Sequence, residues 1–197
     1  MIIDKLFSSF DNYLPLNSAE KDDLAGRVIQ RKIKRRQFIL QENDVCKHYT
    51  FVAKGCFKKL QVDDKGTEHN LQFAAEGDWL MEIVSFYYEK PSRVYIEAIE
   101  PSIIFQISKP DLYHLFDNNP KFDRNFRVIV ENRLVETENR VFQAISSTAE
   151  ERYLAFIKQY PHLLSRLPNT QIASYLGITP EFLSKVRKDL LKNSGYP

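Results

Sequence analysis

The chain has 197 residues, enough for one large domain or two small ones, and its formal net charge of +2 selects no class of partner. Hydrophobic residues make up 43% of the sequence, which predicts a packed core and excludes wholesale disorder. The two cysteines, Cys46 and Cys56, are too few for an all-cysteine iron–sulfur or zinc site, and idle thiols are favoured over a disulfide. Without a signal peptide or an apolar run of about 18 residues, we expect a cytoplasmic protein with no membrane partner.

The first part of the chain changes from helical to β-favouring patterns. Residues from about 2 to 24 have helical apolar spacing, which is broken at Pro15 and restarts near Ser18. Short β-favouring segments then follow, at residues 28–33, 38–40, 49–53, 57–62, 70–73, 94–99 and 103–107. Asp63-Asp64-Lys65-Gly66 predicts a hairpin turn between two of them. Such close, regular spacing predicts an antiparallel sandwich or barrel.

Residues 77–86, GDWLMEIVSF, interrupt the β-favouring segments. They do not alternate, and their helical spacing predicts one or two turns packed against the β-structure. A helical interruption of this kind can line a ligand pocket. A helix that merely closes the barrel explains the pattern equally well.

A long helix is predicted after a shorter one that begins at Lys109. Residues from about 120 to 146 include no Gly or Pro after Pro120, and apolar or small side chains recur three or four apart, at Phe126, Val130, Leu134, Thr137, Val141 and Ile145. Charged side chains occupy the opposite faces, at Arg127, Glu131, Glu136 and Arg140. At 1.5 Å per residue, a helix of about 25 residues is about 37 Å long, more than a small barrel needs for cover. We therefore expect it to pair with a second copy as a coiled coil, the alternative being packing along its own barrel.

A domain boundary is predicted just after the long helix. Thr148 and Glu151 have the spacing of a capping box, which starts a new helix that Pro161 ends. The predicted domains are therefore residues 1–146 and 147–197.

Residues 169–192, NTQIASYLGITPEFLSKVRKDLLK, have the pattern of a helix-turn-helix. Gly177 falls at the turn, and the small Ala173 falls where two helices cross closely. Apolar residues occupy the positions of the seam between the helices: Ile172, Leu176, Ile178, Leu183 and Val186. Thr179 can cap the second helix, and Pro180 suits its first position. An ordinary helical hairpin is the alternative.

The second helix, residues 179–192, has side chains that can reach base edges or phosphates. The candidate DNA-binding residues are Thr179, Glu181, Phe182, Ser184, Lys185, Arg187 and Lys188. Glu181 could accept a hydrogen bond from a cytosine amino group, and Lys185 could donate to guanine or to a phosphate. Arg187 and Lys188 suit the phosphate backbone, while Phe182 could touch a thymine methyl or pack inward.

The order of these parts resembles the bacterial Crp/Fnr family of transcription regulators. The resemblance is strongest in residues 172–191 and extends to Gly55-Cys56-Phe57-Lys58 and to residues 73–79, FAAEGDW. It implies an α+β protein with an N-terminal antiparallel β-barrel or jelly roll, flanking helices and a long dimerisation helix at about 120–146. It also implies a sensor domain at 1–146 and an all-α helix-turn-helix domain at 147–197. The family's β-hairpin wing is expected to be absent or truncated, because only residues 193–197 follow the predicted recognition helix.

The resemblance also implies an effector pocket, at Gly77, Asp78, Trp79, Glu82, Ser92, Arg93 and Thr137. Cyclic-AMP-binding members have an Arg at the position of Ser92, whereas Arg93 comes one place later here. A one-residue slip turns a strand side chain to the opposite face, so the charge-assisted contact to phosphate would be lost. Asp78 and Glu82 add negative charge. We therefore expect a different small-molecule effector, or none.

These patterns predict a homodimeric transcription regulator that binds double-stranded DNA, with no enzymatic activity, cofactor or metal. A cupin-like barrel enzyme would need a His-x-His metal motif, and His48 and His69 stand alone. The other alternative is a ligand-binding regulatory or protein-interaction module that no longer binds DNA.

Overall fold

The computed structural model describes residues 1–194, and for the last two of these the backbone alone. The chain divides into two compact units, which we call unit 1 (residues 1–61 and 72–132) and unit 2 (residues 62–71 and from 133 onward). Helices and antiparallel sheets confirm the predicted α+β class. Within the described residues, no helix has the length and apolar character needed to cross a membrane.

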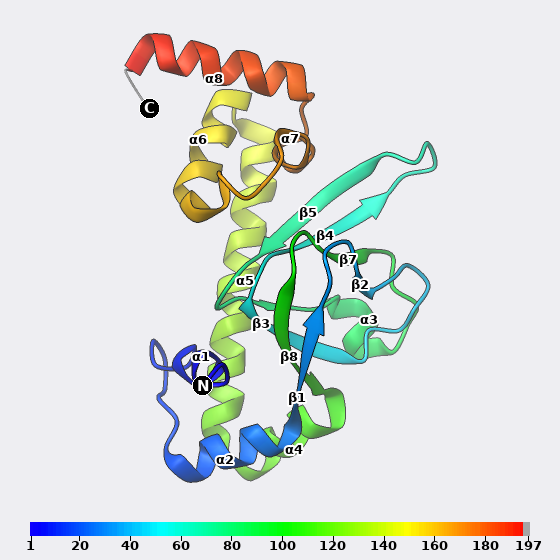
Figure 1. The fold of residues 1–197 in the computed structure, drawn as a ribbon, viewed down its shortest axis with the longest axis vertical. Helices are drawn as coiled ribbons and strands as arrows, with labels where there is room; N and C mark the ends of the chain where they lie inside the picture. Colours follow the sequence, from blue (N-terminus) through cyan, green and yellow to red (C-terminus); the bar gives the residue numbers. More distant parts are fainter. Residues whose placement is uncertain (195–197) are drawn as a thin grey trace. The chain divides into compact units, whose positions relative to one another are not determined.

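The strands form two four-stranded sheets, with the orders β1-β8-β3-β6 and β2-β7-β4-β5 (Figure 1). Their bounds are β1 (Val28–Ile33), β2 (Phe38–Leu40), β3 (His48–Lys54), β4 (Phe57–Val62), β5 (Glu68–Ala74), β6 (Trp79–Leu80), β7 (Tyr95–Ala98) and β8 (Ser102–Ser108). Strand β8 pairs antiparallel with both β1 and β3. The predicted antiparallel arrangement is thus confirmed, while closure of the sheets into a barrel stays a prediction.

The helices that belong wholly to unit 1 are α1 (Asp4–Ser8), α2 (Ser18–Arg27), α3 (Ile83–Tyr88) and α4 (Lys109–Asn118). The long helix α5 (Pro120–Ser146) begins in unit 1 and ends in unit 2. Helix α2 starts at a capping box, because Asn17 accepts a hydrogen bond from the Glu20 amide and Glu20 accepts one from the Asn17 amide. The predicted helical restart near Ser18 is therefore confirmed.

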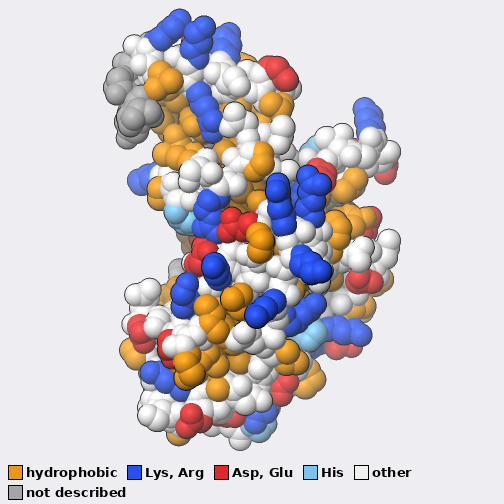
Figure 2. Space-filling model, viewed as in Figure 1, with side chains coloured by type: hydrophobic (Ala, Val, Ile, Leu, Met, Phe, Trp, Pro, Cys, Tyr) orange, Lys and Arg blue, Asp and Glu red, His pale blue; other side chains and the backbone are white. Residues whose placement is uncertain are grey.

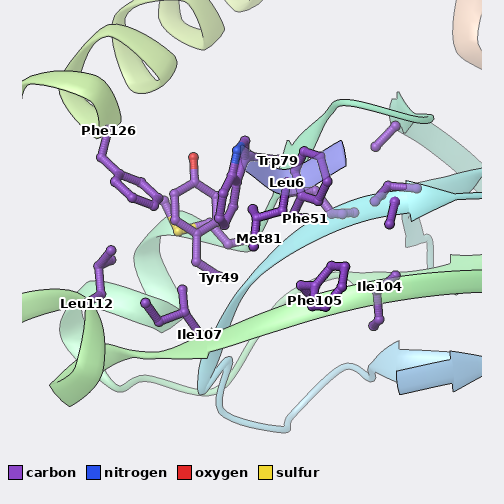
Figure 3. Packing of buried hydrophobic residues seen from close by; sticks show 14 of the residues in the cluster. Leu6, Tyr49, Phe51, Trp79, Met81, Ile104, Phe105, Ile107, Leu112 and Phe126 are labelled. Atoms are coloured by element: carbon purple, nitrogen blue, oxygen red, sulfur yellow. The ribbon is translucent and has the colours of Figure 1, made fainter. Parts of the chain in front are cut away.

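The core of unit 1 follows from the alternation of β3. Tyr49 and Phe51 point to one face of the sheet, opposite Ile107 and Phe105 of β8, and all four are buried. On the same face the Trp79 ring lies 4.9 Å from the Phe126 ring and 5.0 Å from the Tyr49 ring, measured between centroids. Figure 3 shows these rings gathered together. The start of α5 is thereby packed on the sheet.

Unit 2 consists of the second half of α5 and shorter helices, together with the hairpin at residues 62–71. The helices are α6 (Ala149–Gln159), the 3-10 helix η1 (Pro161–Leu163), α7 (Asn169–Leu176) and α8 (Pro180–Ser194). The predicted capping box at Thr148 and Glu151 is present at the start of α6. The predicted domain boundary at 146–147 coincides with the end of α5, whereas the units divide at 132–133.

Within unit 2, the hairpin is attached to α5 and α7 by side chains. The Asn70 amide donates to Ser174 Oγ at 3.0 Å, and Ser174 Oγ donates to the Glu68 carbonyl at 2.7 Å. The Arg140 guanidinium donates to the backbone carbonyls of Asn70, Leu71 and Tyr175, and lies 4.1 Å from the Tyr175 ring centroid. Arg140 was predicted on a face opposite the apolar stripe, and these contacts partly bury it there; burial lowers its pKa.

Residues 77–86 were expected to include one or two helical turns, and α3 supplies them from Ile83 onward. Trp79 and Leu80 before it form β6, because they pair with Phe51 and Thr50 of β3. The predicted absence of a wing concerns residues 193–197, of which 195–197 lie outside the described residues.

Candidate nucleic-acid interface and effector pocket

The turn between α7 and α8 has the backbone geometry that the sequence predicted. Gly177 ends α7 with a φ of 68°, in the left-handed region that a side chain disfavours. The Ile178 amide donates to the Ala173 carbonyl at 3.0 Å, which closes the turn. Thr179 Oγ1 accepts from the Phe182 amide at 3.2 Å, so the predicted cap of α8 is confirmed.

The predicted seam between the two helices is buried almost completely. Its buried members are Ile172, Ala173, Leu176, Leu183 and Val186, and Ile178 is half-buried. Since α7 and α8 are joined through this apolar seam, the other face of α8 is presented outward.

The outer face of α8 carries most of the candidate DNA-binding side chains. Glu181, Ser184, Lys185 and Lys188 are all exposed, at a spacing of three to four residues that aligns them along one side of the helix. Figure 2 shows Lys and Arg side chains gathered over α8. Phe182 is 45% exposed and so does not pack fully inward.

Arg187 is arranged differently from the other candidates. Its Nη1 donates to Asn169 Oδ1 at 2.6 Å, and its guanidinium lies 5.2 Å from the Tyr153 ring centroid. Its Nε is buried without a hydrogen-bond partner among the described residues. Arg187 thus links α8 to α6 and α7.

Hydrogen bonds also define the chemistry at the start of α8. They come from the backbone amide of Glu181 and from the side chain of Thr179, and they lower the pKa of the Glu181 carboxyl. The carboxylate is therefore ionised at neutral pH and can only accept hydrogen bonds. Among the Watson–Crick groups in the major groove, the amino groups of cytosine and adenine are its possible donors.

Most of the predicted effector residues make contacts within their own segment or in the core. Gly77 takes a φ of 95°, and Asp78 Oδ2 accepts from the Ala75 amide at 2.8 Å in the same turn. Trp79 is a core residue. Glu82 caps α3, because its carboxylate accepts from the amides of Val84 at 3.2 Å and Ser85 at 2.6 Å.

The two residues at the predicted phosphate position point in different directions. Ser92 is buried, and its hydroxyl donates to the Val94 carbonyl at 2.9 Å. Arg93, the next residue, is exposed. Thr137 belongs to unit 2, where it is exposed and its hydroxyl donates to the Arg133 carbonyl at 2.8 Å.

Unit 1 has a cavity of about 320 Å³ that no sequence motif marked. Arg31, Thr50 and Gln106 line it, and none of residues 77–93 does. The available signal was a single polar residue, Thr50 or Gln106, within each of the otherwise apolar segments 49–53 and 103–107.

Comparison with known proteins supports the architecture. Residues 30–119 match the family model described as the cyclic nucleotide-binding domain. FixK2 from Bradyrhizobium japonicum superposes with a TM-score of 0.74 and 17% identity, over 84% of this chain and 85% of that one. The CLP regulator of Xanthomonas campestris, described as c-di-GMP responsive, gives a TM-score of 0.69 and 17% identity, over 90% and 93%. No curated protein gives a significant sequence match.

A CooA mutant from Carboxydothermus hydrogenoformans is similar as well, with a TM-score of 0.71 and 16% identity over 94% of this chain and 84% of that one. At such low identity these similarities establish the fold. They extend across most of each chain and therefore include both units.

Proposed function

We propose that this chain, which carries a cyclic nucleotide-binding domain and has the fold of Crp/Fnr-type regulators, is a DNA-binding transcription regulator that acts as a homodimer. In this proposal α8 enters the major groove, and two copies read successive grooves about 34 Å apart. The unit 1 sensor would respond to an effector other than cyclic AMP.

The observation that carries the proposal is the two-sided character of α8. Leu183 and Val186 face the buried seam, while Glu181, Lys185 and Lys188 face solvent. This arrangement anchors one side of the helix in the seam and leaves an acceptor and two cations on the other side for bases and phosphates. Its Thr179 cap fixes the end of the helix that would approach the base edges.

The proposed dimer is supported by an apolar surface on the second half of α5. Five large apolar side chains there are exposed, and Phe142 and Ile145 reach 71% and 82%. The others are Leu134, Val135 and Val141. Leu134 and Val141 are seven residues apart, the repeat of a coiled coil, so a second copy of the same helix is the natural partner.

Binding to duplex DNA tests the role of α8. Operators would first be selected from random duplexes with the wild-type chain, and Lys185→Ala would then be compared on the selected site. If Lys185 contacts a base, its loss weakens specific binding by about 1–3 kcal/mol. Lys158→Ala is the matched control, because Lys158 is exposed on α6 and its loss removes the same charge from the same unit. Equal affinities of Lys185→Ala and the wild type would refute this assignment.

The oligomeric state tests the role of α5. Val141→Glu places a charge in the apolar surface and should convert a dimer to a monomer in sedimentation equilibrium. Asn139→Glu adds the same charge at an exposed polar position of the same helix and should leave the dimer intact. A wild-type chain that is monomeric at micromolar concentration would contradict the proposal.

The dependence of DNA binding on salt separates the proposal from a module that no longer binds DNA. A regulator that neutralises phosphates loses affinity linearly in log–log coordinates as salt rises. A protein-interaction module would show almost no duplex binding at low salt.

Binding of cyclic AMP tests the effector part of the proposal. No cationic side chain occupies the position of buried Ser92, and the carboxylate of Glu82 is already used as a helix cap. Isothermal titration with cyclic AMP should therefore give no heat of binding. Micromolar affinity would contradict the expectation of a different effector.

A further inference from the structure

The cavity in unit 1 lies between the two sheets. One wall comes from β1, β8 and β3, the other from β2 and β7, and the loop at residues 44–47 forms the rim. Its volume of about 320 Å³ is near the lower end of the range for small-molecule pockets. None of residues 77–93, which include most of the predicted effector residues, contributes to the lining.

A row of hydrogen-bonded polar side chains crosses the first wall. Arg31 Nη1 donates to Gln106 Oε1 at 2.8 Å, and Gln106 Nε2 donates to Thr50 Oγ1 at 3.0 Å. Thr50 and Gln106 are 2% and 4% exposed, so this row is built into the sheet. These bonds engage the Gln106 oxygen and one hydrogen of its Nε2. The second Nε2 hydrogen, the remaining guanidinium hydrogens of Arg31 and the hydroxyl hydrogen of Thr50 are the donors in this row that a ligand could use.

Positive charge prevails around this row. Arg31 and Lys47 are cationic and Asp44 is anionic, and all three line the cavity. The His48 ring also lines it, and burial, together with the charges of Arg31 and Lys47, lowers the pKa of His48. The remaining titratable group, the Cys46 thiol, has a pKa that burial raises, so it stays neutral. Within the described chain neither Lys47 nor His48 has a side-chain hydrogen bond or ion pair.

We propose that this cavity binds a small organic anion, whose carboxylate or phosphate group pairs with Arg31 beside Lys47 and His48. A guanidinium suits either group because its planar fork matches two oxygens at once. The apolar part of the ligand would lie against Leu40 and Ile96 of the opposite wall. This proposed site is independent of the DNA-binding proposal, so each can be tested separately.

The rim loop connects the cavity to the neighbouring α3 segment. The Cys46 amide donates to Ser85 Oγ at 2.8 Å, and the Ser92 amide donates to the Asp44 carbonyl, also at 2.8 Å. The Asn43 amide donates in turn to the Ser92 carbonyl at 2.8 Å. These hydrogen bonds join the rim of the cavity to Ser85 and Ser92, which belong to the segment where the sequence predicted an effector.

His48 provides a direct reporter of occupancy. An anion beside the ring favours its protonated form, so binding must raise the pKa of His48. By linkage, the same anion must bind more tightly as the pH falls toward that pKa. An effect on His48 separates binding in the cavity from binding to surface lysines.

The experiment is an NMR titration of the histidine rings in the full chain, with a His48→Asn variant for assignment. The probes are hexanoate and butyl phosphate, which distinguish the two anionic groups, and hexanamide, which has the apolar part without the charge. All titrations are run at constant ionic strength. At least one anion should raise the pKa of His48, and hexanamide should not.

Two variants locate the anion. Arg31→Gln should weaken the affinity for the anion, measured from the change in the His48 pKa, about tenfold or more. This is the size expected from losing a charge-assisted contact. Lys32→Gln makes the same charge change at the next, exposed position of β1, which faces away from the cavity, and should respond as the wild type. The proposal is overturned if neither anion moves the His48 pKa in the wild type, or if the two variants respond alike.

Discussion

The outer face of α8 and residues 77–93 of unit 1 were both singled out as functional, yet their side chains are used very differently. On α8, Lys185 and Lys188 extend into solvent. In residues 77–93, Trp79 is packed in the core, Glu82 caps a helix and Ser92 is hydrogen-bonded to its own neighbour. The difference shows that one segment keeps its polar groups available for a partner, whereas the other uses them to build its own fold.

Trp79→Ala gives the largest expected effect, because it tests whether this residue is structural. The indole packs against Tyr49, Phe51 and Phe126, so its removal leaves a cavity beside the sheet. We expect a loss of about 3–5 kcal/mol in the free energy of unfolding, measured by urea denaturation.

Trp79→Phe is the control for this change. It keeps a ring in the core and removes the indole Nε1, which is buried without a hydrogen-bond partner among the described residues. Its cost should therefore be much smaller than that of alanine. A stable Trp79→Ala chain would mean that the side chain is free for an effector after all.

Gly177→Ala tests the turn that orients α8. No atom lies within 4 Å of an added Cβ, so the cost comes only from the φ of 68°. We expect a loss of about 1–2 kcal/mol in thermal unfolding. Gly26→Ala is the matched control, since Gly26 lies within helix α2 and also has open space around it; there alanine should be neutral or stabilising. Equal effects of the two changes would contradict the strained turn.

Glu82→Ala has a smaller expected effect and separates a structural carboxylate from a ligand-binding one. Loss of the α3 cap should cost about 1 kcal/mol of stability. Glu82→Asp keeps an acceptor at the cap and should recover most of it. A variant as stable as the wild type that loses binding of a small molecule would show that Glu82 serves the pocket instead.

The parts of the fold that follow from local pattern were predictable. The long helix agrees with α5, and the caps at Thr148 and Thr179 are present, because each depends on residues three or four apart. The antiparallel sheets followed from the close, regular spacing of short β-favouring segments and from the turn at residues 63–66. The outer face of α8 followed from the same helical period that buries its seam.

What could not be predicted depends on contacts between distant residues. Arg140 sits at a polar position of the α5 pattern, but carbonyls about seventy residues earlier in the chain accept its hydrogen bonds. The helical pattern of α8 predicts that Arg187 contacts the DNA backbone, whereas its guanidinium donates a hydrogen bond to Asn169. The cavity beside Arg31 brings together strands β1, β3 and β8, and only the tertiary pairing places Gln106 between Arg31 and Thr50.

Lys188→Ala has the smallest expected effect and tests how the solvent-facing residues of α8 divide between bases and backbone. Lys188 lies two turns beyond Glu181, so we assign it to a phosphate rather than to a base edge. Its loss should weaken binding almost equally on the selected operator and on random duplex, and should lower the slope of log affinity against log salt by about 1. Lys185→Ala should instead reduce the difference in affinity between the operator and random duplex. If Lys188→Ala narrows that difference in affinity and leaves the salt slope unchanged, then base reading extends two turns beyond Glu181, and the assignment of Lys188 to a phosphate is wrong.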